Sequence, residues 1–120
     1  MNGLDGKWRL YQKWDGAPKY HMTMILEPSG TLTIENHPQY FGTYTYNEEN
    51  QTIELAIADF SNNHSISIYK GGRVWLFSFG GTAQGANRRR PNQTVAGSWS
   101  MQAEPMLETE EQGVLVAGLD

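Results

Sequence analysis

Apolar and polar residues alternate along most of the 120-residue chain, and a period of two is typical of half-buried β-strands. In residues 7–14 (KWRLYQKW), one face carries two tryptophans, a leucine and Gln12, while the other carries three basic residues and a tyrosine. The same pattern returns in seven later segments, which are residues 20–27, 31–35, 40–46, 52–59, 64–70, 73–80 and 95–102. The pattern therefore predicts eight short strands.

The alternation also predicts which side chains face inward. In residues 64–70 the period places Ile66 and Ile68 on the inner face. In residues 73–80 (RVWLFSFG), Trp75 and two phenylalanines share one face, and valine and leucine lie on the other. Because both faces of this strand are apolar, we expect it to be covered on its outer side as well.

The segments between the predicted strands are short and rich in turn-forming residues. Residues 15–19 (DGAPK), residues 28–30 (PSG) and the pair Gly71-Gly72 are expected to reverse the chain, and an arginine-containing loop precedes the last strand. Strands joined in this way pair as an antiparallel meander, and eight of them can close without leaving an exposed edge. The predicted fold is all-β, an eight-stranded antiparallel up-and-down barrel.

Residues 105–120 differ in composition from residues 1–104, which we predict to form the barrel domain. They join an acidic stretch (PMLETEEQ) to a short apolar run (GVLVAG). One interpretation is a loosely packed tail. The other is an arm that pairs with a neighbouring subunit or covers a face of the barrel.

Composition narrows the class of protein. Apolar residues make up 38% of the chain, which is enough for a core, and the formal net charge of −4 argues against general affinity for nucleic acid or anionic membranes. No apolar run approaches the roughly 20 residues of a membrane span. The absence of cysteine suits a reducing cytoplasm, although an exported chain without its signal has the same composition. We predict a cytoplasmic protein with no nucleic-acid partner and no membrane span.

A glycine stands two residues before an aromatic residue at three places, Gly6-Lys7-Trp8, Gly42-Thr43-Tyr44 and Gly97-Ser98-Trp99. Such a glycine lets the backbone pass close to a large ring at the end of a barrel. The first and last motifs lie on strands that become neighbours when the barrel closes. We therefore expect Trp8 and Trp99 to be buried together at one end.

With these motifs, residues 3–104 resemble the calycin superfamily, and within it the compact lipocalin-like and avidin-like barrels. Three departures distinguish the chain from those relatives. No arginine follows Trp99, there is no room for the two helices of fatty-acid-binding proteins, and no cysteine is present for the disulfide of the bacterial inhibitor type. The resemblance therefore supports the fold and identifies no ligand.

The interior of the barrel is the predicted binding site. An eight-stranded barrel is just wide enough either to be filled by side chains or to hold one small ligand. In the second case, Gln12 and tyrosine hydroxyls orient a small aromatic or lipid-like molecule in a shallow apolar pocket. The residues predicted to line this pocket are Gln12, Trp14, Met24, Tyr44, Tyr46 and Trp75.

Three consecutive arginines, Arg88, Arg89 and Arg90, stand in the loop before the last predicted strand. One interpretation is a solvated loop with no partner. The other is a site that contacts an anion or an acidic protein, because guanidinium groups bind carboxylates and phosphates with paired hydrogen bonds. We predict these arginines as the partner-binding residues.

No pattern of catalytic, metal-binding or cofactor-binding residues accompanies the strands. The three histidines, His21, His37 and His64, lack the spacing of metal ligands, and no serine stands in a G-x-S-x-G elbow. The predicted function is a non-catalytic binding protein, for a small apolar ligand in the barrel or a protein at its rim. The alternatives are a small enzyme with its site at a barrel mouth and an assembly subunit that forms a homo-oligomer through the apolar strand VWLFSF.

Overall fold

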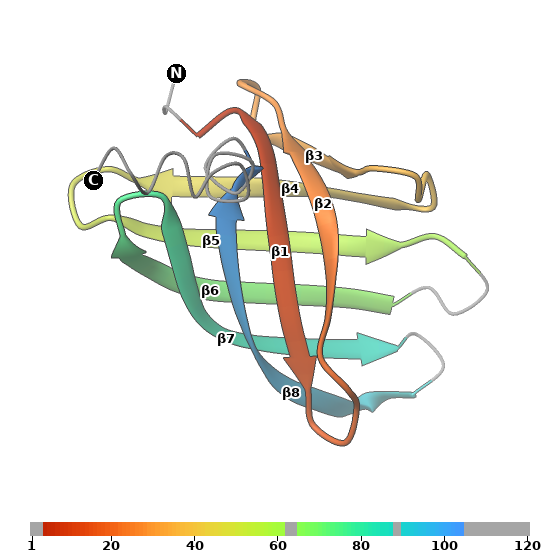
Figure 1. Cartoon of the computed structure of the whole chain (residues 1–120). Helices are drawn as coiled ribbons and strands as arrows, with labels where there is room; N and C mark the ends of the chain where they lie inside the picture. The colour runs from red at the N-terminus through yellow and green to blue at the C-terminus, as the bar shows by residue number, and fades with distance from the viewer. Residues whose placement is uncertain (1–3, 62–64, 88–89, 105–120) are drawn as a thin grey trace.

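The computed structural model of the chain describes residues 4–61, 65–87 and 90–104, which form eight strands joined by short connections (Figure 1). Each strand pairs antiparallel with the next, and the last strand pairs with the first, so that the sheet closes into a barrel. The predicted fold class is therefore confirmed. The strands are β1 (Gly6–Trp14), β2 (Tyr20–Leu26), β3 (Thr31–Ile34), β4 (Tyr40–Asn47), β5 (Thr52–Asp59), β6 (Ser65–Trp75), β7 (Ser78–Asn87) and β8 (Arg90–Ala103).

The two ends of the barrel carry different connections. At one end, named here the Leu4 end, the chain enters β1 and leaves β8, and residues 27–30, 48–51 and 76–77 join successive strands. The opposite end, named the Trp14 end, carries residues 15–19 and 35–39 and the chain segments that follow β5 and β7. Residues 105–120, the predicted tail or arm, lie outside the described residues.

Side chains that face inward fill most of the barrel. The alternation predicted for β1 and β5 is confirmed, since Leu10 and Leu55 are completely buried and their neighbours along each strand are more exposed. The buried apolar residues form one cluster, which comprises Leu4, Trp8, Leu10, Met24, Leu26, Leu32, Ile34, Tyr44, Ile53, Leu55, Ile57, Tyr69, Phe79, Ala83, Trp99 and Met101.

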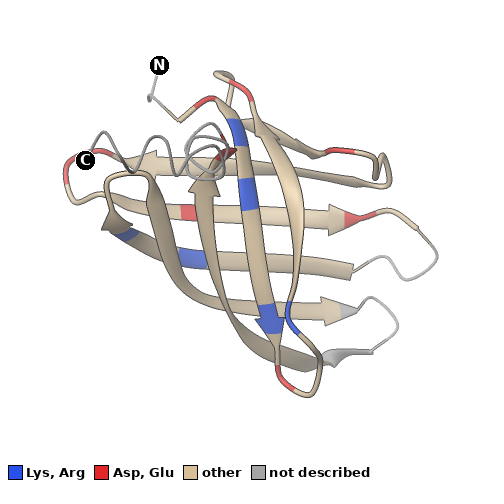
Figure 2. Ribbon diagram, in the orientation of Figure 1, with Lys and Arg blue, Asp and Glu red and all other residues tan. Residues whose placement is uncertain are grey.

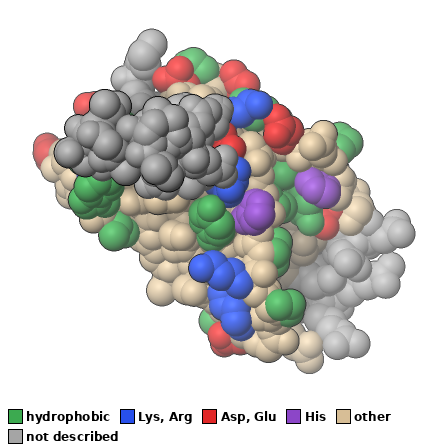
Figure 3. Space-filling model, in the orientation of Figure 1, with side chains coloured by type: hydrophobic (Ala, Val, Ile, Leu, Met, Phe, Trp, Pro, Cys, Tyr) green, Lys and Arg blue, Asp and Glu red, His purple; other side chains and the backbone are tan. Residues whose placement is uncertain are grey.

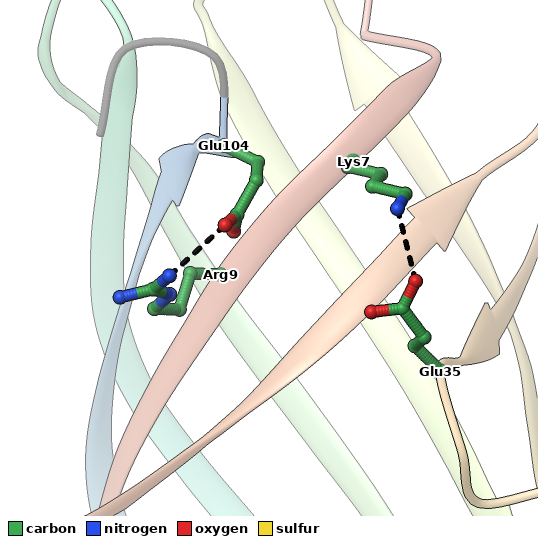
Figure 4. Close-up of polar contacts among 4 residues, drawn as sticks. All are labelled: Lys7, Arg9, Glu35 and Glu104. Atoms are coloured by element: carbon green, nitrogen blue, oxygen red, sulfur yellow. Dashed lines mark hydrogen bonds and ion pairs between the residues drawn. The ribbon is translucent and has the colours of Figure 1, made fainter. Parts of the chain in front are cut away.

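The seam between β1 and β8 runs from Trp8 opposite Ala103 to Trp14 opposite Gly97. On its outer side Arg9 Nη2 lies 2.9 Å from Glu104 Oε1, and this hydrogen bond raises the pKa of Arg9 (Figure 4). Lys7 makes a second ion pair, at 2.9 Å, with Glu35 just after β3. The Lys7–Glu35 pair is open to solvent, and such a pair contributes only about 0–1 kcal/mol, whereas the Arg9–Glu104 pair is partly buried.

Charged residues occur along several strands and in the connections between them (Figure 2). Lysine and arginine occur along β1 and β6, whereas most of the acidic residues lie in the connections. Lys70 on β6 pairs with Glu54 on the adjacent β5 at 3.6 Å. Within the described residues, no helix has the length and apolar character needed to cross a membrane.

The hairpin between β6 and β7 differs from the prediction. Gly71 and Gly72 do not reverse the chain but lie inside β6, and the turn falls five residues later, at Leu76 and Phe77. The glycine-rich residues 80–87, predicted as part of a loop, belong to β7. The segment VWLFSF is consequently not one strand but the end of β6, a turn and the start of β7.

Close packing between strands explains why these glycines are not turn residues. Gly71 lies opposite Gly81, and a methyl group added to Gly71 would lie 2.0 Å from the carbonyl oxygen of Gly80. The indole N–H of Trp99 donates to the carbonyl oxygen of Lys70 at 3.2 Å. Glycine is needed here because the backbones of β6 and β7 and a large ring approach one another closely.

The inner face of β6 also differs from the prediction. Tyr69 is buried and faces inward with Ser67, whereas Ile66 is 54% exposed on the outside. The prediction that Ile66 and Ile68 face inward is therefore wrong. Ile66 lies opposite Ala58, which itself lies opposite Phe41, so the outer surface of the sheet is apolar at this point.

Trp8 and Trp99 are both buried and lie on neighbouring strands, as predicted. They do not share one end of the barrel, however, because Trp8 pairs with Ala103 while Trp99 pairs with Gln12. The antiparallel register places the glycine motif of β1 at the Leu4 end and that of β8 opposite the C-terminal part of β1.

Candidate functional site

The candidate site is a polar cluster inside the barrel, made by Gln12, Trp14, Ser67 and Tyr69 and named here the Gln12 cluster. Strand β1 supplies Gln12 and Trp14, since its alternation turns every second side chain inward. Strand β6, across the barrel, supplies Ser67 and Tyr69. Gln12 is only 1% exposed and is the one buried polar residue among those described.

Two hydrogen bonds fix the side chain of Gln12. The Tyr69 hydroxyl donates to Gln12 Oε1 at 2.7 Å, and the Trp14 indole N–H donates to the same oxygen at 3.0 Å. The indole nitrogen can only donate, so the atom facing it must be the amide oxygen rather than the amide nitrogen. The orientation of the Gln12 amide is thereby determined by Trp14.

The amide nitrogen of Gln12 is left without a partner. Gln12 Nε2 is buried and makes no hydrogen bond, although it carries two donor hydrogens. An unsatisfied buried donor costs about 1–3 kcal/mol relative to one that is paired. The Gln12 cluster therefore contains a buried donor that none of the described residues uses.

Three aromatic rings pack together at the Gln12 cluster. The Tyr69 ring makes edge contacts with Trp14 and with Trp99, each with ring centroids 6.0 Å apart. The Trp14 ring lies against β7 and β8, where a methyl group added at Gly85 or Gly97 would lie 3.3 Å from Cη2 or 3.1 Å from Cε3 of the indole. The two glycines thus make the space that the Trp14 ring occupies.

Partly exposed side chains pack against the core at both ends of the barrel, and two of them, Tyr46 and Ala103, lie at the Leu4 end. Trp14, Met22 and Tyr40 pack against the core but remain partly exposed. These three side chains form the rim of the barrel at the Trp14 end. The Gln12 cluster lies directly below this rim.

Burial raises the pKa of Tyr69 well above its ordinary value, and a hydrogen bond with Ser67 opposes this effect only in part. The hydroxyl therefore keeps its proton at neutral pH and continues to donate to Gln12. The cluster contains no charged group under these conditions. It is a site for hydrogen bonding, not for proton transfer at neutral pH.

This raised pKa predicts a loss of stability in alkali. Above the ordinary tyrosine pKa of 10, the unfolded chain releases the Tyr69 proton while the folded chain retains it. The free energy of unfolding should then fall by up to about 1.4 kcal/mol per pH unit, with no contribution from Tyr69 below that pH. Urea unfolding between pH 9 and about 11 tests this. Tyr69→Phe should reduce the slope, and a slope equal to that of the wild type would contradict the assignment.

The structure brings together only part of the predicted pocket. Gln12 and Trp14 are in contact, but Met24 is fully buried in the core. Tyr44 donates to the carbonyl oxygen of Glu27 at 2.6 Å, and Tyr46 accepts a hydrogen bond from an arginine next to the 76–77 turn, so both lie toward the Leu4 end.

Trp75 was predicted to face the interior, and this placement is wrong. Its side chain is 64% exposed, because the chain turns immediately after Trp75, which is the last residue of β6. Its neighbour Leu76, which the alternation placed on the opposite face, is 63% exposed.

The most important residue that the sequence pattern missed is Tyr69. In residues 64–70 the isoleucines occupy one face and serine and tyrosine the other. Hydrophobicity predicts that the isoleucines face inward. In the structure the serine and tyrosine face inward instead, and Tyr69 makes a hydrogen bond with Gln12. Serine is mostly exposed in proteins, so Ser67 gave no signal that this face points inward.

The remaining predicted residues are not brought into a site. Arg88 and Arg89 lie outside the described residues, as does the side chain of Arg90, and their role as partner-binding residues stays a prediction. His21 and His37 are exposed, and His64 is not described. In the described part of the chain, histidine and acidic residues form no group of three that could hold a metal ion.

No protein-family model, curated protein or solved structure matches the chain. Its fold and site define it as a closed eight-stranded antiparallel β-barrel with a buried hydrogen-bonding cluster near one end.

Proposed function

We propose that the protein is a non-catalytic binding protein that holds a small ligand at the Trp14 end of its barrel. The observation that carries the proposal is the unpartnered Gln12 Nε2, a buried donor whose amide is held in one orientation by Trp14 and Tyr69. Such an arrangement costs folding free energy unless a bound molecule supplies the missing acceptor. A binding site is the simplest reason to retain it.

The chemistry of the cluster defines the ligand class. The rings of Trp14, Tyr69 and Trp99 favour an apolar or aromatic body, and Gln12 Nε2 favours an acceptor such as a carbonyl oxygen. The cluster contains no cation to compensate a buried negative charge. The proposed ligand is therefore a small neutral molecule that joins an apolar or aromatic group to a carbonyl-type acceptor.

The proposal includes membership of the calycin superfamily, in which barrels of this topology carry ligands. Its support is the closed eight-stranded meander together with the burial of Trp8 and Trp99 on adjoining strands. Trp8 and Trp99 lie at different heights along the barrel, so they do not form the paired motif on which the resemblance rests. The ligand proposal depends on the Gln12 cluster and not on this membership.

Two naphthalene probes test the ligand class. One, 6-propionyl-2-dimethylaminonaphthalene, is neutral and carries a ketone; the other, 2-dimethylaminonaphthalene, lacks it. Titrating the ketone probe should quench tryptophan emission saturably, and it should bind about 3- to 10-fold more tightly than its ketone-free analogue, which is the effect of one hydrogen bond.

Variants locate the binding. Gln12→Met keeps the size of the side chain and removes the donor, but it also removes the oxygen that accepts from Tyr69 and Trp14. The affinity for the ketone probe relative to its analogue should therefore change in Gln12→Met, whereas Gln84→Met makes the same substitution at an exposed position on β7 and should leave it as in the wild type. Absence of saturable quenching, or identical ratios in the wild type and Gln12→Met, would show that the barrel interior is not the site.

A further inference from the structure

Four consecutive apolar side chains are exposed where β6 turns into β7. Val74, Trp75, Leu76 and Phe77 are 70%, 64%, 63% and 45% exposed, and they are named here the apolar tip. Single exposed apolar residues are ordinary, but a contiguous group of large ones marks an interaction surface. The tip lies at the Leu4 end, so it is separate from the Gln12 cluster.

Turn chemistry does not explain this sequence. The other described connections contain the residues that turns require, as in Asp15-Gly16, Pro28-Ser29-Gly30 and Asn36-His37-Pro38. The connection between β6 and β7 contains no glycine, proline, asparagine or aspartate. The apolar side chains of the tip are therefore not there to form the turn.

The tip is held in a defined position. The Arg73 guanidinium donates to the carbonyl oxygen of Leu76 and, at 3.0 Å, to the Tyr46 hydroxyl, and it stacks 4.7 Å from the centre of the Phe79 ring. From the other side, the backbone N–H of Ala103 donates to the carbonyl oxygen of Phe77 at 3.1 Å. A surface held in this way loses little conformational entropy when it binds.

A groove lies directly beside the tip on the outer face of the barrel. It has a volume of about 300 Å³ and is bounded by Val74 of the tip and by Tyr11 and Lys19, with Ser100 and Gln102 of β8 between them. It contains no acidic side chain and one lysine, whose ammonium group lies over the Tyr11 ring. Figure 3 shows hydrophobic side chains at the left edge of this face, where Figure 1 places the β6–β7 turn, and a surface with few charged side chains between them and the basic side chains further right.

We propose that a second copy of this chain occupies the groove, with the apolar tip of each copy seated in the groove of the other. Val74 belongs to the apolar tip and also lines the groove, so the tip and the groove form one continuous surface. A two-fold interface requires this, because it uses the same surface of both copies. The tip alone is small beside the roughly 800 Å² per partner of a stable interface. A two-fold axis doubles the contact, because every tip–groove contact occurs twice.

The surroundings of the tip favour this occupant over a lipid surface. Glu48 and Glu49 in the turn between β4 and β5, and Glu104 after β8, lie at the same end of the barrel as the tip. Inserting the tip into a bilayer would bring these carboxylates to the headgroups. The groove surface, in contrast, has few charges, as the centres of protein interfaces do.

Analytical ultracentrifugation of the full chain tests the proposal. We expect a reversible dimer whose fraction rises with concentration. Trp75→Ser combined with Leu76→Ser should shift the protein to the monomer, and Ser100→Arg, in the groove, should do the same. Phe60→Ser combined with Ile66→Ser removes two equally exposed apolar side chains elsewhere and should leave the dimer intact. Circular dichroism of each variant establishes that it is folded.

Mixing the two monomeric variants distinguishes a reciprocal interface from tip-to-tip packing. The tip variant retains its groove and the groove variant retains its tip, so one of the two contacts is restored in a mixed pair. We expect partial recovery of the dimer in the mixture and none in either variant alone. No recovery, with both variants folded, would overturn the proposed arrangement.

The emission of Trp75, obtained as the difference between the wild type and Trp75→Phe, identifies other occupants. A blue shift that grows with protein concentration supports the second copy. A blue shift independent of concentration would mean that the chain's own residues 105–120 cover the tip. A shift seen only with phosphatidylcholine vesicles would mean a lipid surface. Either result, like a chain that stays monomeric to about 0.5 mM, would overturn the proposal.

Discussion

Trp8→Ala should lower the free energy of unfolding by about 3–5 kcal/mol, the range found when a buried tryptophan or phenylalanine is truncated. The Trp8 side chain is 6% exposed and makes an edge contact with Phe79 at 5.8 Å. Its indole N–H also donates to the buried carbonyl oxygen of Leu4 at 2.8 Å, which the substitution leaves without this donor. The melting temperature should fall by more than roughly 10 °C.

Trp75→Ala is the matched control, because it removes the same side chain from an exposed position. Its effect should stay within about 1 kcal/mol. Urea unfolding followed by circular dichroism measures both variants, at a protein concentration low enough that pairing of subunits contributes little. Equal losses at the two positions would contradict the placement of Trp8 in the core and of Trp75 on the surface.

Gly42→Val should destabilise the barrel to a similar extent, by about 3 kcal/mol or more, through overpacking rather than a cavity. A methyl group added at Gly42 would lie 2.1 Å from the carbonyl oxygen of Ala56 and 3.1 Å from Cα of Ile57, both in the backbone of β5. No side-chain rotation relieves such a contact, so β4 and β5 must separate locally.

The neighbouring Thr43→Val supplies the comparison for Gly42→Val. Thr43 is exposed on the same strand, and valine suits a strand, so this change should alter stability by less than about 0.5 kcal/mol. Differential scanning calorimetry of the two variants is the measurement. A Gly42→Val protein as stable as the wild type would mean that β4 and β5 are further apart than the structure places them.

The period of two was sufficient to predict the number of strands and their meander, because each half-buried strand carries its own pattern. It failed at the hairpin between β6 and β7, where apolar residues occupy both faces and the turn itself. Glycine has two different roles in this chain. Gly30, between β2 and β3, adopts a turn conformation with φ of 97°, whereas Gly71 and Gly81 are required by the close approach of two backbones. Sequence alone does not separate these two uses of glycine.

Only half of the Gln12 cluster was predictable from the sequence. Gln12 and Trp14 lie on one strand, so their shared face follows from the alternation. Tyr69 reaches Gln12 across the barrel, from 57 positions further along the chain, and no local pattern encodes that meeting. The unpartnered amide nitrogen is less predictable still, because it depends on the direction in which the indole N–H of Trp14 points.

The pairing of β1 with β8 also determines when the protein can become native during its synthesis. Seven ladders join strands that follow each other along the chain, and these can form as local hairpins soon after the second strand of each leaves the ribosome. The ladder between β1 and β8 can form only after β8, the last strand, has been synthesised. Until then the nascent chain presents unpaired backbone along β1 and along the latest strand to be made, and these are the templates on which incomplete chains associate. The folded barrel has no free strand edge, but the intermediates that precede its closure have two free strand edges.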